Sequence, residues 1–303
     1  MTLLLSITAT LAWGFAIAGL VWCCGSLARQ ITYVTLADGR RAERKLPLSF
    51  RLLLPFAPNA TPLVSGPAFA RARQETDSRL ASAGFDGLLS STEFLALRIL
   101  HPVVLGLGWT LLMLFFSRVD DTLRDYAGLL SLAGILLFAL HPILWLRSAV
   151  RARHHSIRRA LPFLLDLLTL SVEAGMDFMS ALQRSVDSRP LDPLGEEVIR
   201  MSHEIQLGTS RRDALRAMGA RMNLPELRSV TQALVQADEL GVSIGSTLRI
   251  QADQMRQRRF ATAEKLANEA PVKLLGPLML CIFPAVFIVL LGPILSQVMG
   301  NLL

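Results

Sequence analysis

Two pairs of carboxylates lie beside glycines in the second half of the sequence. Glu173 and Asp177 bracket one glycine, and Asp238 and Glu239 precede another. Paired carboxylates can act as general acid and base, or bind a divalent cation. Here they stand where a helix is predicted to end, and negative charge there opposes the helix dipole. A local conflict of this kind can mark a functional surface. We favour exposure to solvent or salt bridges with neighbouring helices, then a partner-binding surface, then a metal or catalytic site.

The histidines form two further pairs of interest. His154 and His155 are adjacent, so they project to different faces of a helix and do not form a ligand pair. We expect them to belong to a basic collar at the membrane surface, together with Arg151, Arg153, Arg158 and Arg159. His101 and His141 lie near the ends of two apolar stretches. We expect these two at the lipid headgroups or in internal hydrogen bonds, with a proton path as the alternative.

Short motifs for known enzyme chemistry are missing from the sequence. It contains no G-x-x-x-x-G-K-[ST] phosphate loop, no H-E-x-x-H, no C-x-x-C and no G-x-S-x-G. The three cysteines have neither disulfide nor metal-ligand spacing. We therefore expect a protein that is not an enzyme and has no cofactor.

A repeated glycine indicates how these residues are positioned. The stretches EAGMDFMSAL, QLGTSRRDAL and ELGVSIGSTL begin at residues 173, 206 and 239, so their glycines, Gly175, Gly208 and Gly241, are 33 residues apart. A glycine at the end of an amphipathic helix adopts the left-handed conformation without steric cost. Each stretch therefore predicts helix, tight turn, helix. The helix that follows each glycine is expected to begin at Asp177 or Ser180 in the first stretch, Ser210 in the second and Ser243 in the third.

The three units predict a compact bundle rather than a solenoid. The leucine seven places after each glycine should pack back on the preceding helix; these are Leu182, Leu215 and Leu248. Unequal linkers between the units, and the lack of known repeat signatures, argue against a regular helical array. The expected fold class is all-α, with residues 147–273 forming a cytoplasmic six-helix bundle of helical hairpins.

Four stretches are apolar enough to span a bilayer. The chain has 303 residues, of which 52% are hydrophobic and 18% charged, whereas soluble domains carry about 25% charged residues. A span needs about 20 apolar residues. The sequence predicts an N-terminal anchor at 1–28, a transmembrane hairpin at 99–146 and a C-terminal span at 274–303. The anchor lacks a positive region ahead of its apolar run, so we expect it to be retained rather than cleaved.

Lysine and arginine set the expected orientation. Residues 29–98 hold ten and residues 147–273 hold nineteen, and such residues are enriched on the cytoplasmic side. Both termini should then be periplasmic. The enrichment of lysine and arginine beside the spans also explains a pI near 10.1, so nucleic-acid binding is not needed to account for it.

The segment 29–98 is predicted as a cytoplasmic linker and a small helical region. Residues 31–46 suggest a strand pair with a turn at Asp38 and Gly39. The proline-rich stretch 52–69 reads as a linker. Helix returns from residue 71, ends at Gly84 and begins again with Ser91 as N-cap. Pro284 lies in the last span, where proline kinks a membrane helix.

Several of these stretches resemble the type II secretion system F domain. They are VEAGMDFMSAL, EIQLGTSRRDALRAM, the run from NLPELRSV to QADQMRQRR, and PVKLLGPLMLCIFPAVFIVLLGP. The likeness covers residues 150–298 well and 79–98 loosely. One large cytoplasmic copy, where full-length platform proteins of this family carry two, is most similar to the Tad (Flp) pilus branch.

The resemblance implies a bacterial inner-membrane platform without catalytic residues. Its partners would be a cytoplasmic hexameric secretion ATPase, pilin subunits, a sister platform protein in an oligomer, and membrane lipid, but no nucleic acid. The alternative is a membrane transporter or channel subunit, which predicts polar residues across the spans. A membrane-bound signalling protein or enzyme is a third interpretation and needs a clustered chemical site. Candidate partner contacts are Glu173, Gly175, Gly208, Glu239, Gly241, Arg256, Arg258, Arg259 and Pro284.

Overall fold

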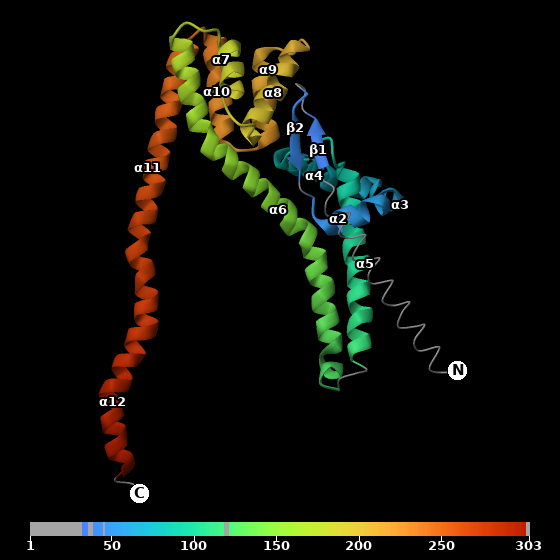
Figure 1. Ribbon diagram of the computed structural model, residues 1–303, viewed down its shortest axis with the longest axis vertical. Helices are drawn as coiled ribbons and strands as arrows, with labels where there is room; N and C mark the ends of the chain where they lie inside the picture. The colour runs from blue at the N-terminus through green and yellow to red at the C-terminus, as the bar shows by residue number, and fades with distance from the viewer. Residues whose placement is uncertain (1–31, 36–38, 45, 118–120, 301–303) are drawn as a thin grey trace. The chain divides into compact units, whose positions relative to one another are not determined.

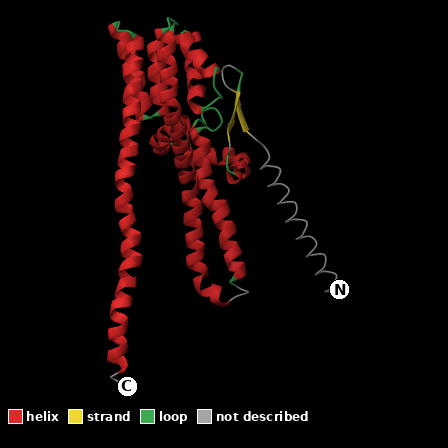
Figure 2. Ribbon diagram, turned by 60° about the vertical axis from the view of Figure 1, so that its left-hand side comes forward, coloured by secondary structure: helices red, strands yellow, loops and turns green. Residues whose placement is uncertain are grey.

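The computed structural model describes residues 32–35, 39–44, 46–117 and 121–300. It divides into two compact units, residues 1–248 and 249–303, which are described separately. The described chain is helical apart from one short β-hairpin (Figures 1 and 2). The predicted N-terminal anchor at 1–28 lies outside the described residues.

The elements of the first unit follow in chain order. They are β1 (Thr32–Thr35), β2 (Arg41–Arg44), α2 (Leu48–Leu53), η1 (Leu54–Phe56), α3 (Ala57–Val64), η2 (Pro67–Phe69), α4 (Ala70–Ala83), α5 (Ser91–Phe116), α6 (Asp121–Glu173), α7 (Phe178–Asp187), α8 (Pro193–Gln206), α9 (Arg211–Met222), α10 (Pro225–Leu240) and the start of α11 (Ile244–Pro277). The antiparallel pairing of β1 with β2 confirms the strand pair expected from the sequence.

The proline-rich stretch is not a linker, which corrects the prediction. It folds into α2, η1, α3 and η2, because three of its prolines occupy first-turn positions, where the missing N–H has no partner to lose. Phe50, Leu53, Ala57 and Val64 are buried. Phe50, Leu53 and Ala57 share a core with α4, α5 and α6. This burial, which local sequence does not reveal, holds the short helices in place.

Helices α4 and α5 are joined by a glycine-ended turn. Gly84 has φ +76° at the end of α4, as the sequence predicts. The N-cap of α5 is Ser90 rather than the expected Ser91. Its hydroxyl accepts from the Glu93 amide, and the Glu93 carboxylate accepts from the Ser90 amide, which completes a capping box.

Among the described residues, three helical stretches are long and apolar enough to cross a membrane: Ser91–Phe115, Asp125–Glu173 and Ile244–Pro293. They include the second, third and fourth predicted spans. Helices α5 and α6 run side by side as a hairpin (Figure 1). Trp109 of α5 donates to the carbonyl of Leu130 at 3.1 Å. A Cβ at Gly134 would lie 2.1 Å from the Trp109 ring, so the absence of a side chain there permits the close packing.

The part of α6 beyond its apolar run continues into a set of antiparallel helices. Helices α6 to α10 alternate in direction and pack on their sequence neighbours, and α6 also contacts α8 (Figure 1). Leu182, Leu215 and Leu248 are all buried, as the repeat predicts. Because α11 passes from the first unit into the second at residue 249, the closed six-helix bundle remains a prediction. We call α7 to α10 with the adjoining parts of α6 and α11 the helical domain.

The second unit consists of most of α11, a π-helical segment (Leu278–Ile282) and α12 (Phe283–Gly300). Helix α11 continues through Pro271 to Pro277. The π-helical turn lies directly before Pro284. Proline cannot donate to the helix and clashes with the carbonyl four residues earlier, and a π-bulge relieves such a conflict.

Candidate functional site

Three glycine turns lie together at one end of the helical domain. Gly175, Gly208 and Gly241 have φ of +90°, +102° and +68°. After each glycine the next residue donates to the carbonyl five residues earlier: Met176 to Ser171 and Thr209 to Glu204 at 3.0 Å, and Val242 to Ala237 at 2.9 Å. These are the six-to-one bonds of Schellman motifs. A Cβ at any of the three glycines would meet open space. The glycines are therefore needed for backbone conformation rather than for packing.

Polar caps restart two of the helices. Asp177, one of the two expected restarts of α7, accepts from the amide of Met179 at 2.9 Å. Ser210 accepts from the amide of Asp213 at 3.1 Å, and its hydroxyl lies 2.6 Å from the Asp213 carboxylate. The Ser210 hydroxyl, and then the guanidinium of Arg216, lower the pKa of Asp213. The cap thus favours the ionised carboxylate.

Contacts between the turns show that they share one surface. A Cβ at Gly245 would lie 3.5 Å from the side chain of Val172, which places the start of α11 beside the end of α6. Arg211, at the start of α9, pairs with Asp238 at the end of α10. We call this surface the turn end; Figure 1 shows it at the top of the helical domain.

The carboxylates of the turn end differ in their surroundings. Glu239 pairs with Arg216, and Asp238 also lies 3.5 Å from Arg212, so this pair forms interhelical salt bridges. Glu173 is exposed. Among the described residues, no three His, Cys, Asp or Glu side chains gather as metal ligands would. The turn end is thus a charged surface in which α9 and α10 are cross-linked by ion pairs.

Apolar side chains project beside these charges, and the sequence analysis did not single them out. Leu207 is 74% exposed and Leu240 77% exposed, each directly before a glycine, and Val242 is also exposed. The repeat could have revealed them, because a residue beside a glycine that ends a helix lies past the last buried turn of that helix. Large apolar side chains at such a position can form the contact surface for another protein.

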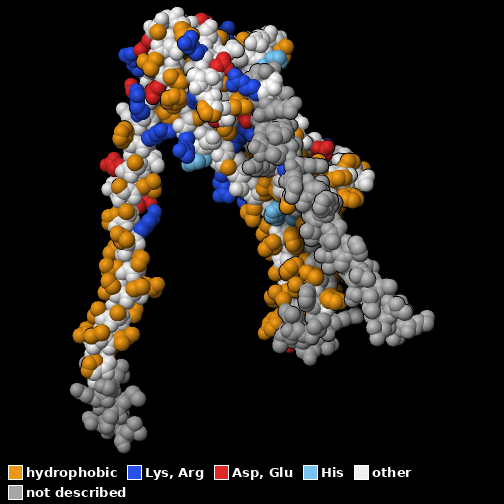
Figure 3. All heavy atoms as spheres, in the orientation of Figure 1, with side chains coloured by type: hydrophobic (Ala, Val, Ile, Leu, Met, Phe, Trp, Pro, Cys, Tyr) orange, Lys and Arg blue, Asp and Glu red, His pale blue; other side chains and the backbone are white. Residues whose placement is uncertain are grey.

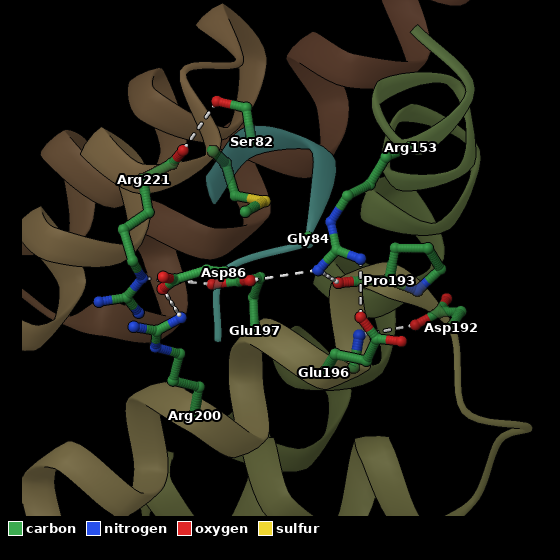
Figure 4. A network of polar contacts seen from close by, with 12 residues as sticks. Ser82, Gly84, Asp86, Arg153, Asp192, Pro193, Glu196, Glu197, Arg200 and Arg221 are labelled. Atoms are coloured by element: carbon green, nitrogen blue, oxygen red, sulfur yellow. Dashed lines mark hydrogen bonds and ion pairs between the residues drawn. The ribbon is translucent and has the colours of Figure 1, made fainter. Parts of the chain in front are cut away.

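A buried ion network holds the helical domain to the region before α5 (Figure 4). Arg153 of α6 donates to Glu196 at 2.7 Å and to Glu197 at 3.2 Å, both on α8. Glu196 also pairs with Arg44 of β2, which donates to the carbonyl of Gly84 at 2.9 Å. The positive φ of Gly84 lets the chain turn directly against the two guanidinium groups.

The network extends along α8 to α9 and α4. Arg221 donates to Glu204 at 2.8 Å and approaches Glu197 at 3.4 Å. Its carbonyl accepts from the Ser82 hydroxyl at 3.0 Å.

Arg200 of α8 donates to Asp86 at 2.8 Å. Burial lowers the pKa of Arg200, but the hydrogen bond and charge of Asp86 outweigh this effect and raise it. Arg200 of α8 therefore holds the α4–α5 turn.

The basic collar expected from the sequence is wrong for Arg153. This residue is only 6% exposed and lies among carboxylates rather than at a lipid surface. His154 is half-buried, with Nε2 2.8 Å from the carbonyl oxygen of Met222. Sequence reasoning missed Glu196 and Glu197. Their signal is that Glu197 lies on the same helical face as the buried Leu194, Val198 and Met201.

His101 and His141 are brought together inside the membrane hairpin. Their rings stack with centroids 4.9 Å apart, and Nδ1 of His101 lies 2.9 Å from the carbonyl oxygen of Phe138. His101 is fully buried. This confirms the expectation of internal hydrogen bonding for His101. Phe50 of α2 meets both rings edge-on.

The other candidate contacts lie in the second unit, apart from the glycine turns. Arg256, Arg258 and Arg259 are exposed on α11, and Arg256 pairs with Asp253 at 2.7 Å. Pro284 is in the first turn of α12. The structure thus brings the three glycines together with Glu173 and Glu239, and places the arginines and the proline in a different unit.

The comparisons with known proteins agree with this architecture. Residues 164–292 match the family described as type II secretion system (T2SS), protein F. The match runs from the buried face of α6 through the helical domain into α12. Comparison with curated proteins and with solved structures gave no match. Together with the three described helices that are long enough to cross a membrane, the T2SSF domain at residues 164–292 indicates a membrane protein related to the platforms of type II secretion and type IV pili.

Proposed function

We propose that this protein is an inner-membrane platform subunit of a Tad/Flp (type IVc) pilus machine, similar to TadC, with TadB as the close alternative. It couples a cytoplasmic hexameric secretion ATPase to the extrusion of pilins and has no catalytic activity of its own. The observation that carries the proposal is the T2SSF domain itself, which is continuous with membrane-length helices at both ends. Movement of the domain can therefore reach the membrane without a flexible linker.

A single T2SSF match supports the Tad branch. Platform proteins of related machines carry two copies, whereas one copy is found here, at residues 164–292. A half-platform of this kind would pair with a sister platform protein. The termini would be periplasmic, because the arginine-rich segments flank the spans on the side of the helical domain.

The turn end is the surface that we assign to the ATPase. Helix α6 runs unbroken from Arg147, beside the apolar span, to Glu173. At 1.5 Å per residue, the 28 residues from Arg147 to Gly175 correspond to about 40 Å of helix. The turn end therefore stands well away from the bilayer. It presents Leu207 and Leu240, flanked by ion-paired charges that suit a polar rim.

Charged substitutions on the turn end test this assignment. We expect Leu207→Glu combined with Leu240→Glu to abolish co-purification of the ATPase from solubilised membranes, and to abolish piliation, while the protein still inserts. The matched control is Phe163→Glu, an exposed position on the side of α6 where Arg189 lies close enough to accept the new charge. If the ATPase co-purifies fully with the double variant, the turn end is not the surface that binds the ATPase. Nucleotide hydrolysis by the isolated protein would reject the platform role.

A further inference from the structure

The segment from Leu48 to Phe69 has two apolar faces, of which the protein covers only one. Phe50, Leu53, Ala57 and Val64 are buried. On the other face Phe56 is 57% exposed and Leu63 70% exposed, and Leu48, Leu52 and Phe69 are exposed as well. Figure 3 shows hydrophobic side chains over α3. A soluble surface seldom gathers so many large apolar side chains on so short a segment.

This segment lies at the level where the α5–α6 hairpin changes from charged to apolar. On α5, Arg98 is the last charged residue before the apolar run, and on α6, Arg147 is the first after it. Phe50 packs on His101, three residues past Arg98, and on Trp145, two residues before Arg147. These offsets correspond to about 3–5 Å of helix. Phe50 therefore marks the depth of the lipid headgroups.

Helix α3 occupies the same depth. Val64 packs with Leu95 and Ala96, one turn of α5 or less before Arg98. In Figure 1, α3 runs across the direction of α5 rather than along it. The prolines at 55, 58 and 67 each lie in the first turn of a short helix, so the segment consists of short pieces. The segment therefore lies close to the membrane plane and does not span it.

The charges of the segment suit a lipid surface. Between Leu46 and Ala70 the only charged residue is Arg51. Basic residues lie beyond both ends, at Arg41, Lys45, Arg71 and Arg73, whereas Arg40 and Arg44 pair with Asp187 and Glu196 of the same chain. An apolar face bordered by lysine and arginine is the pattern by which interfacial helices bind anionic bilayers.

We propose that residues 48–69 form a monotopic membrane anchor, which inserts Phe56 and Leu63 into the boundary between headgroups and acyl chains. The occupant of the exposed face is the lipid of the leaflet on the side of the helical domain. Since α2 also contacts both helices of the hairpin through Phe50, the anchor fixes the depth at which the hairpin emerges. This inference does not depend on the pilus function.

Depth-dependent fluorescence quenching tests the proposal on the full-length protein. Cys23, Cys24 and Cys281 are replaced by serine, and a bimane label is attached to a single cysteine at Leu63→Cys or Phe56→Cys. The protein is reconstituted into vesicles of phosphatidylcholine and phosphatidylglycerol. Gln183→Cys, exposed on α7, is the aqueous control, and Leu136→Cys, exposed in the apolar part of α6, is the deep control.

We expect iodide to quench the labels at 56 and 63 several-fold less than the label at 183. Lipids with a nitroxide near the headgroup should quench them several-fold more strongly than lipids labelled deep in the chain, the reverse of the order at 136. Iodide quenching equal to that at 183 would show a solvated surface and overturn the proposal. Protection from iodide without quenching by lipid would overturn it too, since the face would then be covered by the predicted N-terminal anchor or a second copy.

Discussion

Arg153 and Glu196, 43 residues apart in the sequence, form an ion pair of 2.7 Å in which the side chains are 5% and 8% exposed. A buried pair of this kind adds little stability compared with an apolar pair, but removing one partner leaves a charge that cannot regain water. The pair therefore favours a single packing register of α6 against α8. In any other register, or without Glu197 and Arg44 in place, the buried charges would lack partners.

Removing Arg153 should destabilise the helical domain. We expect Arg153→Met to lower the free energy of unfolding by about 3 kcal/mol, because Glu196 and Glu197 lose a buried counter-charge. Thermal and urea unfolding of the full-length protein in detergent, followed by circular dichroism, measures the change. The control is Arg79→Met, which breaks an exposed pair with Glu75 and should cost about 0.5 kcal/mol or less. Equal effects of the two variants would contradict the role of Arg153.

Gly84 is constrained both by its positive φ and by neighbouring side chains, whereas Gly87 is constrained by its positive φ alone. Both glycines have positive φ, so alanine at either position costs about 1–2 kcal/mol of backbone strain. Only at Gly84 would the new Cβ also meet a side chain, lying 2.4 Å from Nη1 of Arg153, whereas at Gly87 it meets open space. We expect Gly84→Ala to be clearly more destabilising than Gly87→Ala in the same unfolding assay. The difference should shrink but not vanish in an Arg153→Met background, because the Arg44 guanidinium would still lie 2.9 Å from the new Cβ.

The sequence predicted those features whose cause is local. The turns at Gly175, Gly208 and Gly241 follow from helix periodicity and the freedom of glycine at positive φ, and the structure confirms them. The buried network was missed, because a Glu-Glu pair looks solvated until Arg153, 43 residues away, is placed beside it.

The proline-rich stretch was misinterpreted for the same reason. Its helices are stabilised by burial of side chains such as Phe50 against the membrane hairpin, and proline is compatible with a helix at its first turn. Local composition therefore argued for a linker where tertiary contacts stabilise a folded segment.

A comparison of valine with asparagine at the glycine turns should show whether backbone strain, rather than the loss of glycine itself, causes any defect. Gly241→Val places a β-branched residue at φ +68°, which such residues resist. We expect a loss of about 2 kcal/mol in stability and failure of pilus assembly, with membrane insertion preserved. Gly241→Asn is the control, since asparagine tolerates the left-handed region and should retain most of both. The same pair of substitutions at Gly175 should repeat the result. Normal piliation with both valine variants would show that the turns are not needed.

The Ser210 cap predicts a contribution to stability that depends on pH. The pKa of Asp213 is lowered in the folded protein, mainly by the Ser210 hydroxyl. A carboxylate with a depressed folded pKa stabilises the fold above its unfolded pKa and loses this contribution as the pH falls below about 4. We therefore expect Asp213→Asn to reduce stability at neutral pH, and its difference from wild type to shrink in acid. A difference that stays constant from pH 7 to pH 3 would contradict the assignment.

The basic face of α11 gives a final prediction about the motor. Arg258 and Arg259 are exposed in the second unit, and charges at the edge of an interface mainly affect association rate and salt dependence. We expect Arg258→Glu combined with Arg259→Glu to reduce ATPase co-purification most strongly at low salt. The amount of ATPase that co-purifies with the double variant should then depend less on salt concentration than it does with wild type. Lys265→Glu combined with Lys273→Glu, two exposed charge reversals further along α11, is the control for the same change in net charge. If the double variant binds as wild type does at every salt concentration, the ATPase does not contact this face, and binding must depend on the turn end around Leu207 and Leu240 alone.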